Sequence, residues 1–260
     1  MKLRFRNLFR RRIPVAGLHP RAAEILREVG EQGLFALPAY YSAEQVRILR
    51  EEIDRWFALR PDTLKVDAQG ADRRLFGIEK LSQPVREIFY DDPLMHGLGA
   101  AYMGSRAEIG YVLAGRIDAA ADNLGSGGGW HRDRSGKPQY KALLYLSDVD
   151  ETRGPFQYLL RSHRREAVKA AQALFGARQK GTRYSDAQIA EFEAAFGDRY
   201  PRHTALGPAG TVLFVDTRGL HRGAPIQSGR RYALTRYTWY GEPMPPHMAA
   251  LVDWQKAAPA

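Results

Sequence analysis

Three side chains of this protein could together bind one divalent metal ion. His131 and Asp133 stand two residues apart in the run GWHRDRSG, and His221 lies in the run FVDTRGLHRGAP. Two imidazoles and one carboxylate can hold a ferrous ion on one face and leave the opposite face open. Zinc also accepts two histidines and one carboxylate. These residues therefore predict a metal site without choosing between the two metals.

The spacing of the three residues indicates how the fold would bring them together. Residues i and i+2 of a β-strand point to the same side, so His131 and Asp133 can reach one ion while Arg132 points away. His221 lies 90 residues after His131 and must come from a different strand or from its end. The preceding run, TVLFVD, predicts the strand that delivers it.

Arg231 follows the second histidine by ten residues and could bind an organic acid. Its planar guanidinium can pair with both oxygens of a carboxylate, which a lysine cannot copy. In the run RRYALTRY, strand alternation places Arg231, Ala233 and Thr235 on one face. Thr235 could then donate its hydroxyl to the same carboxylate. Arg230 and Arg236 fall on the other face, where we expect surface charges.

Weaker candidates surround these residues. Lys141 begins a β-rich run after the metal loop and could line the pocket, and Tyr111 and Arg116 lie on the strand expected before that loop. The glycines at 127–129 precede the first ligand and could form the edge of a lid. Four cationic residues flank the expected ligands and could attract an anionic substrate, namely Arg134, Lys137, Arg218 and Arg222.

The front of the chain has the pattern of helices with one strand. A helix is expected at residues 20–29, ending at the glycine that follows, and a strand at 34–37. A capping-box pattern, Ser42 with Gln45, opens a second helix with an apolar face. Residues 62–75 are polar and charged, and they predict a loop.

From residue 109 onward the pattern changes to short β-rich runs separated by Gly, Asp and Pro. Strands are expected at residues 109–117, 140–146, 155–160, 211–215 and 232–240. A helical insert interrupts them and contains a second capping box, Ser185 with Gln188. Helices followed by many short strands predict a sheet sandwich with helices packed on its outside.

We expect one domain over residues 1–260, because no long linker divides the chain. Its parts would be a basic arm, a mostly helical front part, a β core and the helical insert, at residues 1–14, 15–105, 106–245 and about 162–197. The chain contains no Cys, which excludes disulfides and thiolate metal sites and favours a reducing cytoplasm. No apolar run of about 18 residues predicts a transmembrane helix, and no apolar segment near the start predicts a secretory signal.

The N-terminal arm concentrates positive charge. The run MKLRFRNLFRRR holds six Lys or Arg and no acid, and removing these six from 39 leaves 33 against 29 acidic residues, a net charge of +4. Phe5, Leu8 and Phe9 stand at helical spacing in this arm. A basic segment with an apolar stripe can lie on an anionic membrane surface, and a solvated tail is the alternative. The protein is therefore expected in the cytoplasm, with a peripheral contact to the inner face of the membrane through residues 1–12 as a hypothesis.

Three runs of the chain together resemble the phytanoyl-CoA dioxygenase family. They are GWHRD, YKALLYLSDVDETRGPFQYLLRSHR and HRGAPIQSGRRYALTRY, in the family's order and with its gaps. The resemblance covers about half of the chain, from Tyr111 to Tyr240. One departure is LLRSHR, where relatives carry Pro-Gly before Ser-His; we expect Ser162 and His163 to serve the fold rather than catalysis.

This resemblance implies a double-stranded β-helix, of the jelly-roll or cupin-like kind and mainly β with flanking helices. It implies an oxygenase that depends on Fe(II), O2 and the co-substrate 2-oxoglutarate, with ascorbate as an accompanying reductant. The implied iron ligands are His131, Asp133 and His221. Arg231 is the implied partner of the distal carboxylate of 2-oxoglutarate. Further candidates around the co-substrate are Thr235, Lys141 and Tyr111.

The implied reaction hydroxylates a C–H bond and releases succinate and CO2. Halogenases of this type carry a small residue in place of the ligand carboxylate, so Asp133 argues for hydroxylation or for a related desaturation or epimerisation. The substrate expected is a small or lipid-linked molecule, anionic in view of the basic arm and the cations near the ligands.

Two other functions stay open at this point. A non-oxidative cupin-like protein could use the metal for isomerisation or for sugar binding, but it gives Arg231 no necessary partner. Nucleic-acid demethylases share the iron chemistry and resemble the RYALT stretch. They carry a second Arg six residues after the first, where this chain has Tyr237, whereas Arg236 faces away. No nucleic-acid partner is therefore expected.

Overall fold

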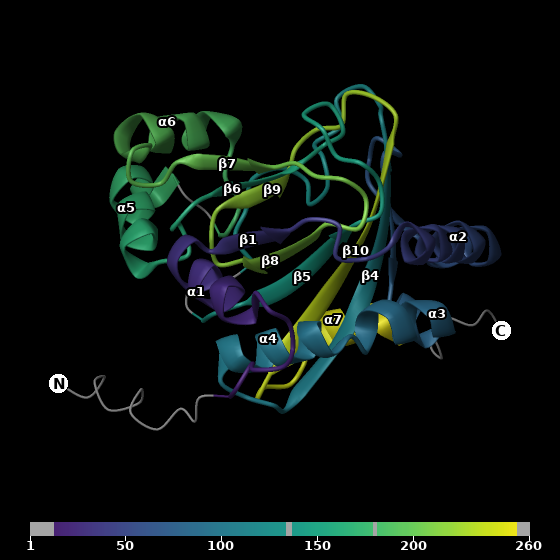
Figure 1. Cartoon of the computed structure of the whole chain (residues 1–260). Coiled ribbons are helices and arrows are strands. Elements are labelled where there is room, and N and C mark those ends of the chain that lie inside the picture. The colour runs from purple at the N-terminus through teal and green to yellow at the C-terminus, as the bar shows by residue number, and fades with distance from the viewer. Residues whose placement is uncertain (1–12, 134–136, 179–180, 254–260) are drawn as a thin grey trace.

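The computed structural model describes residues 13–133, 137–178 and 181–253. The described chain forms two antiparallel sheets that face each other, with helices outside them (Figure 1). The larger sheet has, in spatial order, β1 (Leu34–Leu37), β8 (Val212–Asp216), β5 (Tyr140–Tyr145), β10 (Arg230–Tyr240), β4 (Glu108–Asp118), β3 (Asp72–Phe76) and β2 (Lys65–Val66). The smaller sheet has β7 (Arg202–Ala205), β6 (Phe156–Leu159) and β9 (His221–Gly223). This confirms the predicted class, mainly β with flanking helices.

The helices cover the outside of the two sheets. Those around the larger sheet are α1 (Ala22–Gln32), α2 (Ala43–Leu59), α3 (Gln83–Val85) and α4 (Pro93–Met103). The helical insert contains α5 (Arg165–Phe175) and α6 (Asp186–Phe196), which pack beside the smaller sheet (Figure 1). A short helix, α7 (Pro246–Ala249), lies near the end of the described chain. None of the described helices is long and apolar enough to cross a membrane.

Local sequence signals explain where these helices begin and end. Both predicted capping boxes are present, at the first turns of α2 and α6. The predicted end of α1 at Gly30 is wrong, because the helix continues to Gln32. Gly33 then takes a left-handed conformation, with φ of 90°, that ends the helix. A Cβ at this glycine would also lie 2.2 Å from the Tyr158 hydroxyl oxygen, so only glycine fits.

Strand alternation divides the side chains of the larger sheet between two environments. One face packs on α1, α2 and α4 and carries residues such as Val112, Leu144, Phe214 and Leu234. The other face turns toward the smaller sheet and carries Leu213, Val215 and Tyr145 in a second apolar cluster. All five strands predicted after residue 109 are present, so the β-rich pattern located them correctly. The inner face, between the sheets, is where the candidate site lies.

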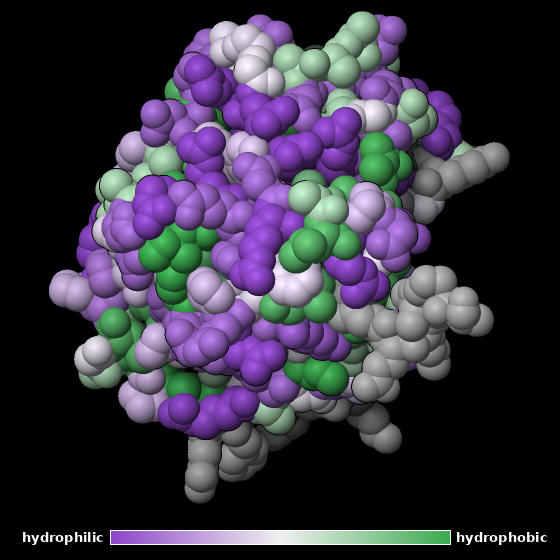
Figure 2. Space-filling view, turned by 90° about the vertical axis from the view of Figure 1, so that its right-hand side faces the viewer, coloured by the Kyte–Doolittle hydropathy of each residue, from purple (hydrophilic) through white to green (hydrophobic). Residues whose placement is uncertain are grey.

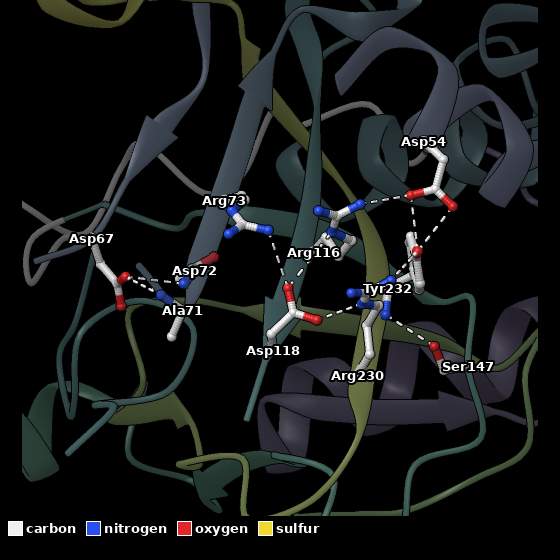
Figure 3. A network of polar contacts seen from close by, with 10 residues as sticks. All are labelled: Asp54, Asp67, Ala71, Asp72, Arg73, Arg116, Asp118, Ser147, Arg230 and Tyr232. Atoms are coloured by element: carbon white, nitrogen blue, oxygen red, sulfur yellow. Dashed lines mark hydrogen bonds and ion pairs between the residues drawn. The ribbon is translucent and has the colours of Figure 1, made fainter. Parts of the chain in front are cut away.

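The prediction of a loop over residues 62–75 is wrong. This segment contains a turn at Pro61–Thr63 and then the β2–β3 hairpin at the edge of the larger sheet. Its outer face has a polar network instead of an apolar core: Asp118 binds Arg73 and Arg230, and Asp54 of α2 accepts from the Tyr232 hydroxyl (Figure 3). Because the residues on that face are polar, the sequence lacks the apolar alternation that would have predicted the strand.

Arg236 is also placed differently from the prediction of a surface charge. It lies on the expected face of β10, but α4 covers that face, and only 1% of its side chain is exposed. Its guanidinium donates to Glu108 Oε1 at 2.7 Å, to Thr238 Oγ1 at 2.9 Å and to the Tyr90 carbonyl at 3.2 Å. Arg230, in contrast, is half-exposed as expected.

Replacing Arg236 by alanine should destabilise the protein by about 3 kcal/mol, because Glu108 then keeps a mostly buried charge without this partner. This loss of unfolding free energy is at the lower end of the range of about 3–5 kcal/mol for breaking a buried ion pair, because 17% of the Glu108 side chain is exposed. Urea unfolding measures it. The control is Arg230→Ala, whose pair is half-exposed and should contribute less than about 1 kcal/mol. Equal losses in the two variants would contradict this assignment.

The outer surface is mixed in character. On the face turned toward the viewer in Figure 2, hydrophilic residues dominate and apolar residues form small separate patches. The large apolar side chains are instead collected in the clusters against and between the sheets. Apolar side chains are therefore concentrated inside the molecule, on both faces of the larger sheet.

Candidate metal centre

The structure brings His131, Asp133 and His221 together between the two sheets. One ligand atom from each lies within 4.8 Å of the others. The two histidines also bind each other through the main chain, since each amide N–H donates to the carbonyl oxygen of the other, at N···O distances of 2.9 and 3.0 Å. The Asp133 N–H donates to the Thr217 carbonyl at 3.0 Å. Main-chain hydrogen bonds thus place ligands that lie far apart in the sequence.

The prediction that His131 and Asp133 belong to a regular strand is wrong. His131 forms only isolated bridges, and Asp133 lies in a bend. The extended segment still turns the two side chains the same way, so that His131 Nε2 lies 4.0 Å from Asp133 Oδ1. Arg132 points away as expected and is buried, donating to the Ser162 carbonyl at 2.6 Å.

The hydrogen bonds of the two histidine rings determine which nitrogen is available to a metal. Nδ1 of His131 lies 2.9 Å from the Gly129 carbonyl oxygen, and Nδ1 of His221 lies 2.9 Å from the Gly219 carbonyl oxygen. A carbonyl only accepts, so each Nδ1 carries the proton and donates it. The lone pair of each Nε2 then remains free, and the ring orientation is fixed.

The electrostatics keep all three side chains in their metal-binding forms. Burial lowers the pKa of His131, and burial together with the neighbouring His131 ring lowers the pKa of His221 to about 3. Both imidazoles are therefore neutral near pH 7. Burial acts to raise the pKa of the Asp133 carboxyl, but the Lys141 ammonium, 2.5 Å from Oδ2, and the two histidines outweigh it and hold that pKa well below its usual range.

These residues fit a ferrous ion. Two neutral imidazole nitrogens and one ionised carboxylate form the donor set of an open three-ligand iron site, which zinc also accepts. Lys141 engages Oδ2 of Asp133, which leaves Oδ1, the oxygen nearer to His131, for an ion. Three ligands on one side leave the remaining coordination positions free.

Arg231 supplies a second feature on the inner face of β10. It is 5% exposed, and its Nε has no hydrogen-bond partner among the described residues. Burial lowers the pKa of its guanidinium. A buried cation without a partner is costly to a folded protein. This position is therefore suited to an anion that the chain does not itself provide.

One cavity joins Arg231 to the two candidate histidine ligands, and Asp133 lies beside it, paired with Lys141 of the cavity wall. His131 and His221 line it together with Lys141, Arg231 and Thr235. It encloses about 630 Å³ of space, part of it open to solvent. Apolar side chains form much of the remaining wall, among them Leu113, Leu143, Phe156 and Val215. The predicted alternation of β10 is thereby confirmed, because Arg231 and Thr235 face the same space.

The weaker candidates occupy different places. Lys141 is buried and lines the cavity, with its ammonium 3.7 Å from the centre of the Tyr237 ring. Tyr111 does not line the cavity; it is fully buried behind Tyr237, and the two rings stack with centroids 5.1 Å apart. Arg116 turns to the opposite face of the sheet and pairs with Asp54 at 2.9 Å.

The cations that flank the ligands are engaged with carboxylates where the structure describes them. Arg134 lies outside the described residues. Each of the other three has an acidic partner: Arg218 with Asp216, Arg222 with Asp186, and Lys137 with Glu242. These contacts give the three cations a structural role at the edges of the site.

The residues that we expected to serve the fold do so. Ser162 Oγ accepts from the Leu220 N–H at 2.7 Å, and His163 Nε2 lies 3.1 Å from the Gly30 carbonyl oxygen. The glycine run has a steric role: Gly127 has φ of 93°, and a Cβ there would lie 2.7 Å from Cε1 of the His131 ring. Glycine at this position therefore lets the loop pass close to the first ligand.

Several side chains that line the cavity were not predicted as site residues from the sequence, and Tyr237 and Arg74 are the largest polar ones among them. Tyr237 shares the alternation of Arg231 and Thr235 along β10, so the same pattern could have identified it. Arg74 also lines the cavity, but it lies on β3, within the segment that was expected to be a loop. No signal in the sequence indicated that this arginine turns inward.

Comparison with known proteins gives relatives at low sequence identity. No family model matches the chain. The ectoine dioxygenase of Stutzerimonas stutzeri (strain A1501) is 24% identical over 221 residues, which are 78% of this chain and 71% of that protein. The epimerase SnoN, solved with Fe3+, alpha-ketoglutarate and nogalamycin RO, has a TM-score of 0.64 at 16% identity over 89% of each chain. EctD from S. alaskensis, solved with bound Fe, has a TM-score of 0.61 at 16% identity over 83% of this chain and 75% of that one.

The sequence relationship and the structural likeness point to one kind of protein. The two solved structures share the fold of this chain, a jelly-roll of facing antiparallel sheets. Within that fold, two imidazoles and a buried guanidinium line one cavity, and the Asp133 carboxylate lies beside the imidazoles. The chain is therefore similar in sequence to an ectoine dioxygenase, and it shares its fold with proteins that were solved with bound iron.

Proposed function

We propose that this protein hydroxylates a C–H bond of a small anionic molecule, using Fe(II), O2 and 2-oxoglutarate. The observation that carries the proposal is the cavity that His131 and His221 share with the buried Arg231, whose Nε has no hydrogen-bond partner among the described residues. A metal protein that performs no oxidation has no need of a second anion-binding group in that cavity. The ectoine dioxygenase, which is related in sequence, supports the same reaction class.

The side chains have separate tasks in this reaction. His131 and His221 bind the ion through Nε2, and Lys141 holds Asp133 so that Oδ1 faces it. Arg231 holds the distal carboxylate of 2-oxoglutarate by a paired hydrogen bond. The bound iron and 2-oxoglutarate supply the oxidising chemistry, which gives succinate and CO2 and places one oxygen atom in the substrate.

The walls of the cavity protect this chemistry and influence which molecule enters. Leu113, Leu143 and Val215 exclude water from the space beside the ligands. Three cationic side chains line the cavity, Arg74, Lys141 and Arg231, and two carboxylates beside it pair with the first two of them. Such a lining favours a substrate with a negative charge.

The decisive experiment measures succinate formed by the purified protein with Fe(II), 2-oxoglutarate and a panel of small acids that includes ectoine. We expect one member to stimulate succinate release, and its product to gain one oxygen atom. Desaturation would instead remove two hydrogens, and epimerisation would leave the mass unchanged. Failure of the iron-loaded protein to bind 2-oxoglutarate in anaerobic calorimetry would overturn the proposal without any knowledge of the substrate.

A lipid-linked substrate would require the protein to reach a membrane, which the basic arm could allow. Residues 1–12 lie outside the described residues. Deleting them should weaken binding to liposomes that contain phosphatidylglycerol by at least about tenfold, since each cation near an anionic surface contributes roughly 1 kcal/mol. Liposome flotation measures the binding, with neutral phosphatidylcholine vesicles as the control. Unchanged binding after the deletion would leave the arm as a solvated tail.

A further inference from the structure

Arg74 stands where three neighbouring cavities meet. It lines the cavity of the candidate ligands, a deeper space beside Arg231, and a third space under the β2–β3 hairpin. Among the described residues, it alone lines all three. An arginine in this position brings a second guanidinium into the space that Arg231 serves.

Asp72 also belongs to this space. In the register of the larger sheet, Asp72 pairs with Ile117 across β3 and β4, and Arg231 pairs with Ile117 from the other side. Asp72 and Arg231 therefore lie in one row, on the same face, two strands or about 10 Å apart at the backbone. An arginine side chain is long enough to cross most of that gap. Asp72 is the carboxylate that, among the described residues, lines the deeper space with Arg231.

Arg74 keeps this carboxylate occupied. Its Nε donates to Asp72 Oδ2 at 2.9 Å, and its Nη2 donates to the same oxygen. Asp72 is only 5% exposed, so water offers it little alternative. Burial lowers the pKa of the Arg231 guanidinium. The negative charge of Asp72 raises this pKa, and the positive charge of Arg74 lowers it, so both residues lie near enough to influence Arg231.

Asp67, in the turn of the β2–β3 hairpin, fixes the backbone position of Asp72. Asp67 Oδ1 accepts from the N–H groups of Ala71 and Asp72, at 2.7 and 3.0 Å (Figure 3). This fixes the backbone of Asp72 at the first residue of β3. The position of its charge is then decided by which guanidinium binds it, Arg74 or Arg231.

The side chains that line this space carry a net positive charge. Arg74 and Arg231 carry two positive charges and Asp72 carries one negative charge, which leaves one positive charge for one incoming carboxylate. We propose that Arg74 is a positioning residue that binds Asp72 and so keeps Arg231 available to the distal carboxylate of 2-oxoglutarate. This inference rests on the proposed function, because it takes Arg231 as the co-substrate's partner.

A pair of substitutions tests the inference without any knowledge of the substrate. Arg74→Gln should weaken 2-oxoglutarate binding about tenfold, because Asp72 is released to pair with Arg231. Adding Asp72→Asn to that variant should restore affinity to within about threefold of the unsubstituted protein, since no competing charge remains. Arg74→Lys retains a cation beside Asp72 and should keep most of the affinity. Calorimetry on the Ni(II)-loaded protein gives the dissociation constants in the absence of turnover.

The neighbouring arginine provides the matched control. Arg73 lies on the opposite face of the same strand, where it pairs with Asp118 at 3.4 Å (Figure 3). Arg73→Gln should leave 2-oxoglutarate binding unchanged. Thermal melting and Ni(II) affinity establish that each variant is folded and keeps its ligand set.

Two results would overturn the inference. One is a double variant that binds 2-oxoglutarate as weakly as Arg74→Gln, since Arg74 would then act on the co-substrate directly or through the fold. The other is normal binding by Arg74→Gln. If Arg231→Ala binds 2-oxoglutarate as well as the unsubstituted protein, the proposed function fails first; if only the Arg74 variants behave unexpectedly, the proposed function stands and this inference alone is wrong.

Discussion

Replacing His221 by alanine is expected to abolish iron-dependent turnover of 2-oxoglutarate. The substitution removes one of three donors that lie within 4.8 Å of one another. Substitution of a group that only orients a metal ligand costs 10- to 100-fold in metal affinity or activity, so loss of a direct ligand should cost more than about 100-fold in both. Fe(II) or Co(II) titration reports the affinity, and succinate release reports the turnover.

The fold should survive this change, because the hydrogen bonds that join residue 221 to His131 are made by the main chain. The matched control is His203→Ala, an exposed histidine on β7 of the same small sheet. It should bind metal and turn over 2-oxoglutarate like the unsubstituted protein. If His221→Ala kept full metal affinity, the assignment of the three ligands would be wrong.

Replacing Arg231 by alanine should leave metal binding intact and weaken 2-oxoglutarate binding at least about 30-fold. Truncating one partner of a buried, hydrogen-bonded charge pair costs about 2–5 kcal/mol or more, and 2 kcal/mol corresponds to a loss of affinity of about 30-fold. The co-substrate carboxylate would lose its guanidinium partner at a position where Arg231 is only 5% exposed. Anaerobic titration of the iron-loaded protein with 2-oxoglutarate measures the dissociation constant.

Arg230 offers the control for this variant. It precedes Arg231 on the same strand, but it points to the outer face and is 48% exposed beside Asp118. Arg230→Ala should change 2-oxoglutarate affinity by less than about twofold, as expected for an exposed ion pair. Equal weakening in both variants would show that positive charge in general, rather than the inward guanidinium, governs binding.

The sequence predicted the parts of the fold that have a regular pattern. The long strand β10 alternates cleanly, so the run RRYALTRY was sufficient to place Arg231 and Thr235 on one face, and that face lines the cavity. The capping boxes at Ser42 and Ser185 located two helix starts for the same reason, since each signal is local. Local and periodic signals are reliable because they depend only on residues of the same helix or strand, and not on partners from distant parts of the chain.

The errors arose where distant partners decide the outcome. Arg236 has the composition of a surface residue, but it is buried because Glu108 and the Tyr90 carbonyl meet it from other elements. β3 lacks apolar alternation because polar groups occupy both of its faces, with Asp72 and Arg74 inside and Arg73 outside. Such sites are satisfied by contacts that a single sequence does not reveal.

The reciprocal hydrogen bonds between the main chains of His131 and His221 also bear on how the protein would acquire the proposed ion. In many small metal-binding domains, the chain wraps around the ion, and the free energy of binding is also the free energy of folding. Here the backbone sets the spacing of the two imidazoles on its own. Metal loading would then be the capture of an ion by a preformed site, with little conformational entropy to lose. A stronger chelator should therefore be able to strip the ion and leave a folded protein that is ready to be reloaded.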